Sequence, residues 1–349
     1  MKNRAAKFER QRIRWKKQKK HRNRMFMGIP KSEHSNLINK IDRYKNYVWI
    51  SPPKIFSMVD NTEKSIQFIS KLERCFSDNK KVFVDLSSVT DIGHGALVVL
   101  LSIMMKFKFN SIDFNGYMPK DTIALQILKS SGFFQELYAK KGHRGLSDTY
   151  KLEKHHFFTH ANKIVDASLS SDIISSISKL IWGKTQRCPK LQRVYIELMQ
   201  NTNNHASLEG HGMQHWWTTA NYDPERNTGC FSFIDYGVGI LSSLKEDKKG
   251  KLYKALDKVK QIFQPNSNAD FLRLLMTGEI HRTASGKYFR GKGLPGIYQA
   301  CVSNQISRLV VISNNTMANF ANNTFTILRN EFSGTFVYWE LAPENNHID

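Results

Sequence analysis

The spacing of apolar residues predicts alternating strands and helices in the first part of the chain. Three short apolar runs are typical of strands; they lie at 47–50, 81–86 and 111–114. Apolar residues three and four positions apart predict helices between and after them; these cover 65–76, 96–107 and 121–131. Strands that alternate with helices in this way indicate an α/β layer architecture.

The remainder of the chain shows a second pattern. Helices are predicted over 170–182 and 191–206, and a third begins near Pro295. Strands are predicted at 214–221, 229–234, 308–313, 323–328 and 335–341. The segment 241–290 between them is Lys-rich and polar toward its end, whereas residues 141–165 are polar and turn-rich. We therefore expect two folded units, 27–140 and 166–349, joined by a linker over 141–165.

Charge separates a third region from these two. The chain has 52 Lys and Arg against 30 Asp and Glu, a net charge of +22, and residues 1–24 hold 12 of the basic residues against Glu9 alone. Residues 1–26 contain too few apolar side chains to build a core, so we expect a flexible basic arm. Such an arm suits a polyanion, with nucleic acid first; a solubilising tail or an arm that docks on its own protein is the alternative.

Composition excludes several classes of protein. The longest apolar run, Ala96 to Met105, is too short to span a membrane, and no apolar segment typical of a signal peptide follows the basic N-terminus. The four cysteines lie far apart and form no CxxC pair, which argues against a disulfide framework and a cysteine zinc site. We expect a cytoplasmic protein.

The helix over 191–206 carries the first candidate chemistry. Glu197, Asn201 and His205 are spaced four residues apart, so they project from one helical face. A carboxylate there can activate a water or hydroxyl, and an amide oxygen can coordinate Mg²⁺. Taken alone, this spacing also fits a hydrated helix face.

A turn with two glycines carries the second candidate chemistry. An apolar strand leads to Asp235, and Gly237 and Gly239 follow. Asp235 can accept a hydrogen bond from an exocyclic amine such as that of adenine, and glycine permits the backbone to approach a ligand closely. Taken alone, the segment also fits an ordinary turn after a strand.

The third candidate is the run Arg290-Gly291-Lys292-Gly293-Leu294, followed by the helix that begins near Pro295. Backbone N–H groups at a helix start bind phosphates, and Arg290 and Lys292 add positive charge. Many glycine-rich loops precede helices without this role.

In their order and spacing, the three motifs make the chain from 166 onward resemble the GHKL superfamily of ATPases and kinases, the Bergerat fold. Glu197 and Asn201 match its N box, and Asp235, Gly237 and Gly239 match its first glycine box. Gly291, Gly293 and Gly296 match its second glycine box, and Gly334-Thr335 resembles its closing Gly-Thr before the last strand. The resemblance implies a two-layer α/β sandwich with an ATP lid.

The same resemblance implies a role for each matched residue. Glu197 would be the general base, Asn201 would hold Mg²⁺ against the phosphates, and Asp235 would read adenine with help from Thr335. Residues 241–292 would be the lid, and its basic residues would meet the γ-phosphate; they are Lys287, Arg290 and Lys292, with Arg282 a weaker candidate. Gly291 to Leu294 would line the phosphates. His205 would contact phosphate or cap the site.

The first unit resembles a STAS domain. Asp85 to Ile92, followed by a short loop and an apolar helix, is similar to the centre of that family, and Leu128 to Tyr138 is similar to its closing segment. Anti-anti-sigma members carry a phosphorylatable serine in this loop, whereas Gly95 occupies its place here. This replacement favours docking of a protein partner over a phosphoswitch.

Together these features predict an ATPase-type conformational switch that requires Mg²⁺ and ATP and regulates a partner or nucleic-acid complex. A serine/threonine kinase or partner-switch regulator similar to anti-sigma kinases is the alternative, and a non-hydrolysing ATP-binding scaffold is a third. The pairing of the two units resembles that of bacterial regulators, some of them in phage-defence clusters. A homodimer is a further expectation.

Overall fold

A small parallel sheet begins the fold. The computed structural model describes residues 44–138, 156–161, 165–205, 216–237, 239–241, 267–279 and 293–345. Strands β1 (Val48–Ile50), β3 (Val82–Asp85) and β5 (Phe114–Tyr117) pair in parallel in the order β1-β3-β5. Ile50, Val82 and Val84 are buried on one face of this sheet.

Two helices connect these strands. Helix α3 (Thr62–Ser77) is amphipathic and buries Ile66, Ile69 and Leu72 at helical spacing. Helix α4 (His94–Phe109) buries every residue from Ala96 to Met105. A helix that is apolar all round must be covered on all sides, so α4 belongs in the interior.

Smaller elements complete this half. The strands β2 (Ile55–Phe56) and β4 (Asp91–Ile92) form a two-stranded parallel pair. Helices α5 (Thr122–Ser130) and α6 (Phe133–Tyr138) follow β5. The Asp121 carboxylate caps α5 by accepting hydrogen bonds from the N–H groups of Ile123 and Ala124.

The second sheet has five antiparallel strands in the order β6-β7-β8-β10-β9. They are β6 (His156–Ala161), β7 (Trp216–Asp223), β8 (Thr228–Asp235), β9 (Ser307–Asn319) and β10 (Thr324–Leu341). Side chains alternate between its faces: Phe231 and Phe233 enter one core, and Ile234 enters the other.

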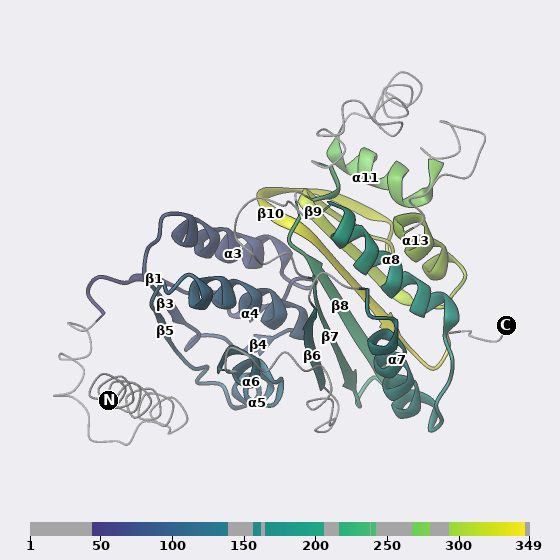
Figure 1. The fold of residues 1–349 in the computed structure, drawn as a ribbon, viewed down its shortest axis with the longest axis horizontal. Coiled ribbons are helices and arrows are strands. Elements are labelled where there is room, and N and C mark those ends of the chain that lie inside the picture. The colour runs from purple at the N-terminus through teal and green to yellow at the C-terminus, as the bar shows by residue number, and fades with distance from the viewer. Residues whose placement is uncertain are drawn as a thin grey trace, which may run out of the picture. The chain divides into compact units, whose positions relative to one another are not determined.

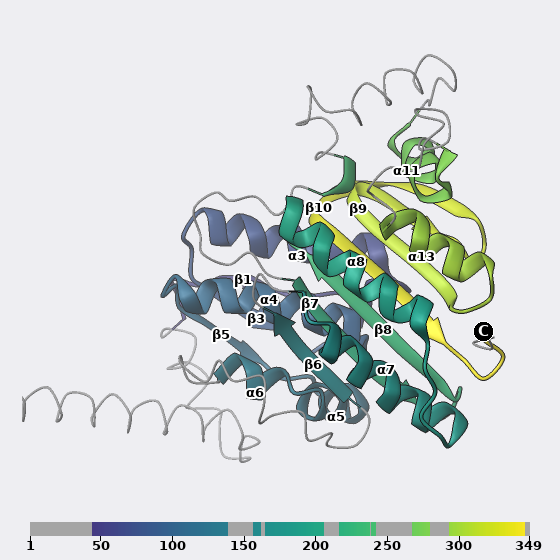
Figure 2. The same ribbon diagram turned by 45° about the vertical axis from the view of Figure 1, so that its right-hand side comes forward.

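Four of the described helices cover one face of this sheet, which we call the site face: α7 (Ala167–Trp182), α8 (Pro189–His205), α11 (Asn268–Thr277) and α13 (Gly293–Val302). Figures 1 and 2 show α7, α8 and α13 on this side. Their apolar residues, including Ile177, Leu191 and Tyr195, form a core with Phe231 and Trp339. The helices therefore fix the position of α8 over the strands.

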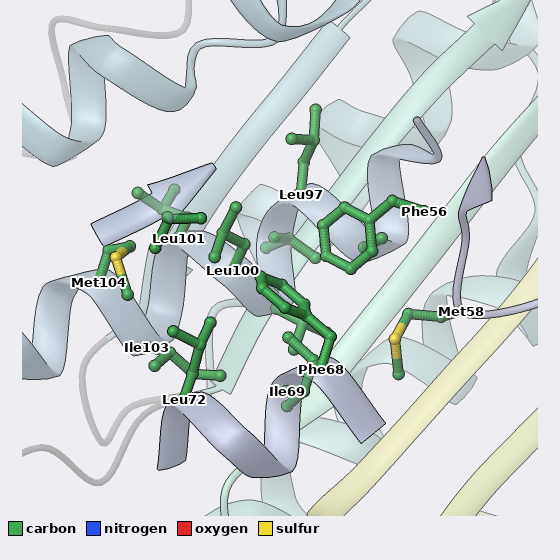
Figure 3. Packing of buried hydrophobic residues seen from close by; sticks show 14 of the residues in the cluster. Phe56, Met58, Phe68, Ile69, Leu72, Leu97, Leu100, Leu101, Ile103 and Met104 are labelled. Atoms are coloured by element: carbon green, nitrogen blue, oxygen red, sulfur yellow. The ribbon is translucent and has the colours of Figure 1, made fainter. Parts of the chain in front are cut away.

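Helices α3 and α4 cover the opposite face, which we call the support face (Figures 1 and 2). Figure 3 shows the interlocking of Phe68, Leu72, Leu100 and Ile103, and the same core includes Ile234 and Phe336 of the five-stranded sheet among its members. Residues 47–349 accordingly form one compact unit, and residues 1–46 are assigned to another, of which the structure describes only 44–46.

Mixed parallel and antiparallel pairing makes this an α/β fold in the general sense predicted. Several strands differ in extent from the sequence-based expectation; β9, for example, covers Ser307–Asn319, where 308–313 was predicted. Strand β5 begins at Phe114, where 111–114 was predicted, because Ser111 adopts φ 58° in the turn after α4. Strand β10 is continuous through register shifts between Ile327 and Thr335, where two strands were predicted.

Two predicted connecting segments contain regular structure. Strand β6 lies within residues 141–165, the segment predicted as a linker, and pairs with β7 along the edge of the sheet. Helix α11 lies within the expected lid segment 241–292, yet it buries Leu272 and Met276 in the site-face core. This part of the segment is thus anchored in the fold.

Two expectations from composition can be compared with the described residues. Within these ranges, no helix combines the length and the apolar character needed to cross a membrane. All four cysteines lie in the described ranges and are free. Residues 1–26, the basic arm, lie outside them.

Candidate functional site

Asp235 ends strand β8 on the site face. It lies across from Trp216 of β7 on one side and Thr335 of β10 on the other. Its Oδ1 atom is buried and has no hydrogen-bond partner within the described part of the chain. Burial raises the pKa of this carboxyl to about 6, although the N–H of Gly237 donates a hydrogen bond that acts against the rise. Asp235 thus presents a buried acceptor that no described residue uses.

The turn after Asp235 is held close to strand β9. Gly239 adopts φ 80°, and a Cβ at this position would lie 2.5 Å from Oδ1 of Asn314. The same Oδ1 accepts a hydrogen bond from the N–H of Leu241 (3.1 Å), and the hydroxyl of Ser313 accepts one from Ile240 (2.8 Å). Glycine is required at 239 because both the dihedral angle and the contact exclude a side chain.

The part of β10 that begins at Gly334 lies on the other side of Asp235. Gly334 adopts φ 116°, and a Cβ there would lie 1.9 Å from the carbonyl oxygen of Asp235. The hydroxyl of Ser313 donates to the carbonyl of Gly334 (3.0 Å) and lies 3.3 Å from that of Thr335. The predicted first glycine box and closing Gly-Thr therefore meet around one carboxyl group.

Glu197 lies on helix α8, which packs against helix α13. Its Oε1 accepts a hydrogen bond from Nε of Arg193 at 2.8 Å, whereas Oε2 is buried and unpartnered among the described residues. A Cβ at Gly296, in the first turn of α13, would lie 3.1 Å from Oε2. The absence of a side chain at 296 thus lets the Glu197 carboxylate lie close to the start of α13.

Several predicted residues lie beyond what the structure describes. The backbones of Asn201 and His205 continue helix α8 one and two turns after Glu197, and their side chains fall outside the description. The loop before α13 is outside it as well, and the predicted residues there are Arg282, Lys287, Arg290, Gly291 and Lys292. Gly293 begins α13, and Leu294 packs against the site-face core.

The sequence did not single out the residues that support this site. Ser313 and Asn314 hold the glycine turn, and Trp216 is the direct neighbour of Asp235. The available signal for Ser313 and Asn314 was a run of four polar residues, 313–316, directly after an apolar stretch. Their role depends on the approach of β9 to a turn more than 70 residues earlier.

A metal ligand set made of protein side chains is not found in the described ranges, since no three His, Cys, Asp or Glu side chains gather there. A Mg²⁺ ion bound through one amide and phosphate oxygens would form no such cluster. The two unpartnered carboxylate oxygens, Asp235 Oδ1 and Glu197 Oε2, suit a donor group and a water or hydroxyl, respectively.

Comparison with known proteins adds no assignment: no protein-family model, no curated protein and no solved structure matches the chain.

Proposed function

We propose that the protein binds ATP with Mg²⁺ and acts as an ATPase-type switch of the GHKL kind, with its N-terminal half as a STAS-like unit. The observation that carries this proposal is the Oδ1 atom of Asp235, buried and unpartnered among the described residues between two close-approach glycines. A buried acceptor left unpaired costs about 1–3 kcal/mol, and an adenine amine would supply the missing donor.

Each described residue has a specific part in this proposal. Asp235 would accept a hydrogen bond from the adenine amine, beside Gly239, Gly334 and Thr335. Glu197 would take a proton from the attacking water through Oε2, while Arg193 holds Oε1. The N–H groups at the start of α13 would face phosphate oxygens. Bound Mg²⁺, for which Asn201 is the expected ligand, would neutralise phosphate charge.

Binding and hydrolysis are tested separately. The dissociation constant for ATP is measured by calorimetry with and without Mg²⁺, and phosphate release is followed under saturating ATP. Replacement of Glu197 by Gln should lower turnover by about 10²-fold or more with ATP affinity kept within a few fold. Replacement of Asp235 by Ala should weaken ATP binding by about 10-fold or more.

The outcomes separate the alternatives. Wild-type protein that binds no adenine nucleotide contradicts the proposal as a whole. Binding without phosphate release favours the non-hydrolysing scaffold. Label from γ-phosphate that appears on a co-purified protein, and not as free phosphate, favours the kinase alternative.

The structure bears on one form of the kinase alternative, self-phosphorylation of the STAS-like loop. Position 95 carries no hydroxyl, and a Cβ there would lie 2.8 Å from the Ser232 hydroxyl and 2.9 Å from the Phe336 ring. An anti-anti-sigma type of phosphoserine therefore has neither the atom nor the space at this position.

A nucleic-acid role for residues 1–24, the cytoplasmic location and the homodimer stay predictions.

A further inference from the structure

The residue after Asp235 points to the opposite face of the sheet. Strand side chains alternate, so Asp235 lies on the site face, and Tyr236 contacts the core of the support face. The hydroxyl of Tyr236 forms a hydrogen bond with the hydroxyl of Ser102 on α4 and lies 3.3 Å from the carbonyl oxygen of Val99. A polar side chain next to the proposed adenine-binding carboxylate is thus bound to the STAS-like half.

Lys106 contacts the same tyrosine. It lies one helical turn after Ser102, and its Nζ is 4.0 Å from the centroid of the Tyr236 ring, a cation–π distance. Burial lowers the pKa of Lys106, and Glu73 of α3 acts against the fall. The ring of Tyr236 is therefore held from its face by Lys106 and from its hydroxyl by Ser102.

Helix α3 holds the segment that closes the other side of Asp235. Glu73 Oε2 accepts a hydrogen bond from the hydroxyl of Ser333 at 3.0 Å. Two further contacts join α3 to the same strand: the Ser70 hydroxyl donates to the carbonyl of Glu331, and Glu63 accepts from the N–H of Arg329. Gly334, next to Ser333, has its backbone against the carbonyl of Asp235.

Two segments flank the Asp235 carboxyl, and both are bonded to helices of the support face: Tyr236 to α4, and Ser333, next to Gly334, to α3. We propose that Tyr236 is a positioning residue for nucleotide recognition: with Ser102 and Lys106 it holds the end of β8, so that the α3–α4 layer sets how tightly and how selectively the base is bound. This inference rests on the proposed function. Looser positioning of Asp235 weakens adenine binding, and it also weakens the rejection of guanine, which presents a carbonyl oxygen where adenine has its amine.

The test measures dissociation constants for ATP and GTP with the full chain. Tyr236→Phe removes the hydroxyl and keeps the ring over Lys106, and Ser102→Ala removes the partner hydroxyl from α4. Each should raise the ATP dissociation constant ~5-fold, the loss of about one hydrogen bond, and should lower the preference for ATP over GTP. Turnover at saturating ATP should change by less than about twofold, since Glu197 is untouched.

Two control variants remove hydroxyls elsewhere in the fold. Tyr222→Phe removes a hydroxyl that donates to Asn227 at the other end of the strands (2.7 Å), and Ser130→Ala removes a serine–carbonyl bond within α5. Both should leave ATP affinity and base preference unchanged.

The outcomes distinguish this inference from the proposed function. If the wild-type protein binds ATP and the Tyr236 and Ser102 variants keep its affinity and base preference, the inference is overturned and ATP binding stands. The inference is also overturned if both variants lower thermal stability alone, because a merely structural contact would do that. Wild-type protein that binds neither nucleotide overturns both.

Discussion

The two faces of the five-stranded sheet differ most at the end of strand β8. On the site face, the Oδ1 atom of Asp235 is buried without a partner among the described residues. On the support face, the Tyr236 hydroxyl meets Ser102 and the carbonyl of Val99. Buried polar groups in native proteins are generally paired. The open acceptor of Asp235 is therefore available to the proposed ligand, whereas the hydroxyl of Tyr236 joins the end of β8 to α4.

Glycines also have different roles on the two faces. On the site face, Gly239 and Gly334 have positive φ and backbone or polar atoms at close range. On the support face, Gly95 lacks a side chain because Phe336 and Ser232 fill the space. The first pair shapes the surroundings of a carboxyl group, and Gly95 permits two layers to pack.

Replacement of Gly334 by Ala should produce the largest change. The new Cβ would lie 1.9 Å from the Asp235 carbonyl oxygen at φ 116°, so the two strands must separate at the site. We expect a loss of at least about 3 kcal/mol of unfolding free energy together with loss of ATP binding, measured by urea denaturation and calorimetry.

Gly183→Ala is the matched control, because Gly183 has φ 71° and no atom lies within 4 Å of the position that a Cβ would take there. It should cost only about 1–2 kcal/mol and leave ATP binding unchanged. Equal costs for the two variants would show that the dihedral angle alone, and not close approach, requires Gly334.

Asp235 should give the next largest effect, with opposite signs for stability and binding. Its pKa of about 6 in the fold exceeds its ordinary value of 3.8, so the folded state favours the protonated form. The contribution of Asp235 to the unfolding free energy should therefore fall as the pH rises from about 4 to 6, by about 3 kcal/mol. Asp235→Asn should remove this slope and stabilise the nucleotide-free protein at pH 7.

The same group predicts the pH dependence of ATP binding. The ionised carboxylate is the stronger acceptor for an amine, so affinity should fall as the pH drops below about 6, and Asp235→Asn should bind ATP more weakly with no such dependence. A pH-independent affinity in the wild-type protein would remove Asp235 from base recognition.

The sequence can propose residues whose chemistry is local. Glu197 and Asp235 became candidates because a carboxylate stands at a fixed position on a periodic helix or at the end of an apolar strand. The apolar helix predicted over 96–107 lies within α4, because the run from Ala96 to Met105 is apolar apart from Ser102. Strand β6 was missed because its segment is polar and turn-rich, and its pairing with β7 depends on tertiary contact.

The supporting residues could not have been predicted in this way. The contact between Tyr236 and Ser102 joins residues 134 positions apart, and that between Glu73 and Ser333 joins residues 260 apart. A tyrosine within a glycine turn and a serine within an apolar helix carry no local signal for their pairing. Such contacts follow from the packing of two layers and not from the periodicity of either.

Gly95→Ser tests the support face with a smaller expected effect. The added Cβ would lie 2.8 Å from the Ser232 hydroxyl and 2.9 Å from the Phe336 ring, so the start of α4 must shift. We expect roughly 1–3 kcal/mol of lost unfolding free energy, measured by urea denaturation. A variant as stable as the wild type would show that the α4 layer yields easily, and would weaken the view of this face as a rigid support.

Replacement of Arg193 by Gln should have the smallest effect on stability and should act on the site face alone. The pair of Arg193 and Glu197 is an i, i+4 ion pair with the arginine 62% exposed, and such pairs contribute no more than about 0.5 kcal/mol. Because Arg193 holds Oε1 while Oε2 lies close to Gly296, its loss lets the carboxylate rotate. Turnover should therefore fall several fold with little change in ATP affinity, measured by phosphate release and calorimetry.

Lys129→Gln on α5, whose side chain is also exposed, is the control for loss of a surface charge. An equal fall in both variants would assign the effect to net charge and leave Arg193 without a role in orienting Glu197.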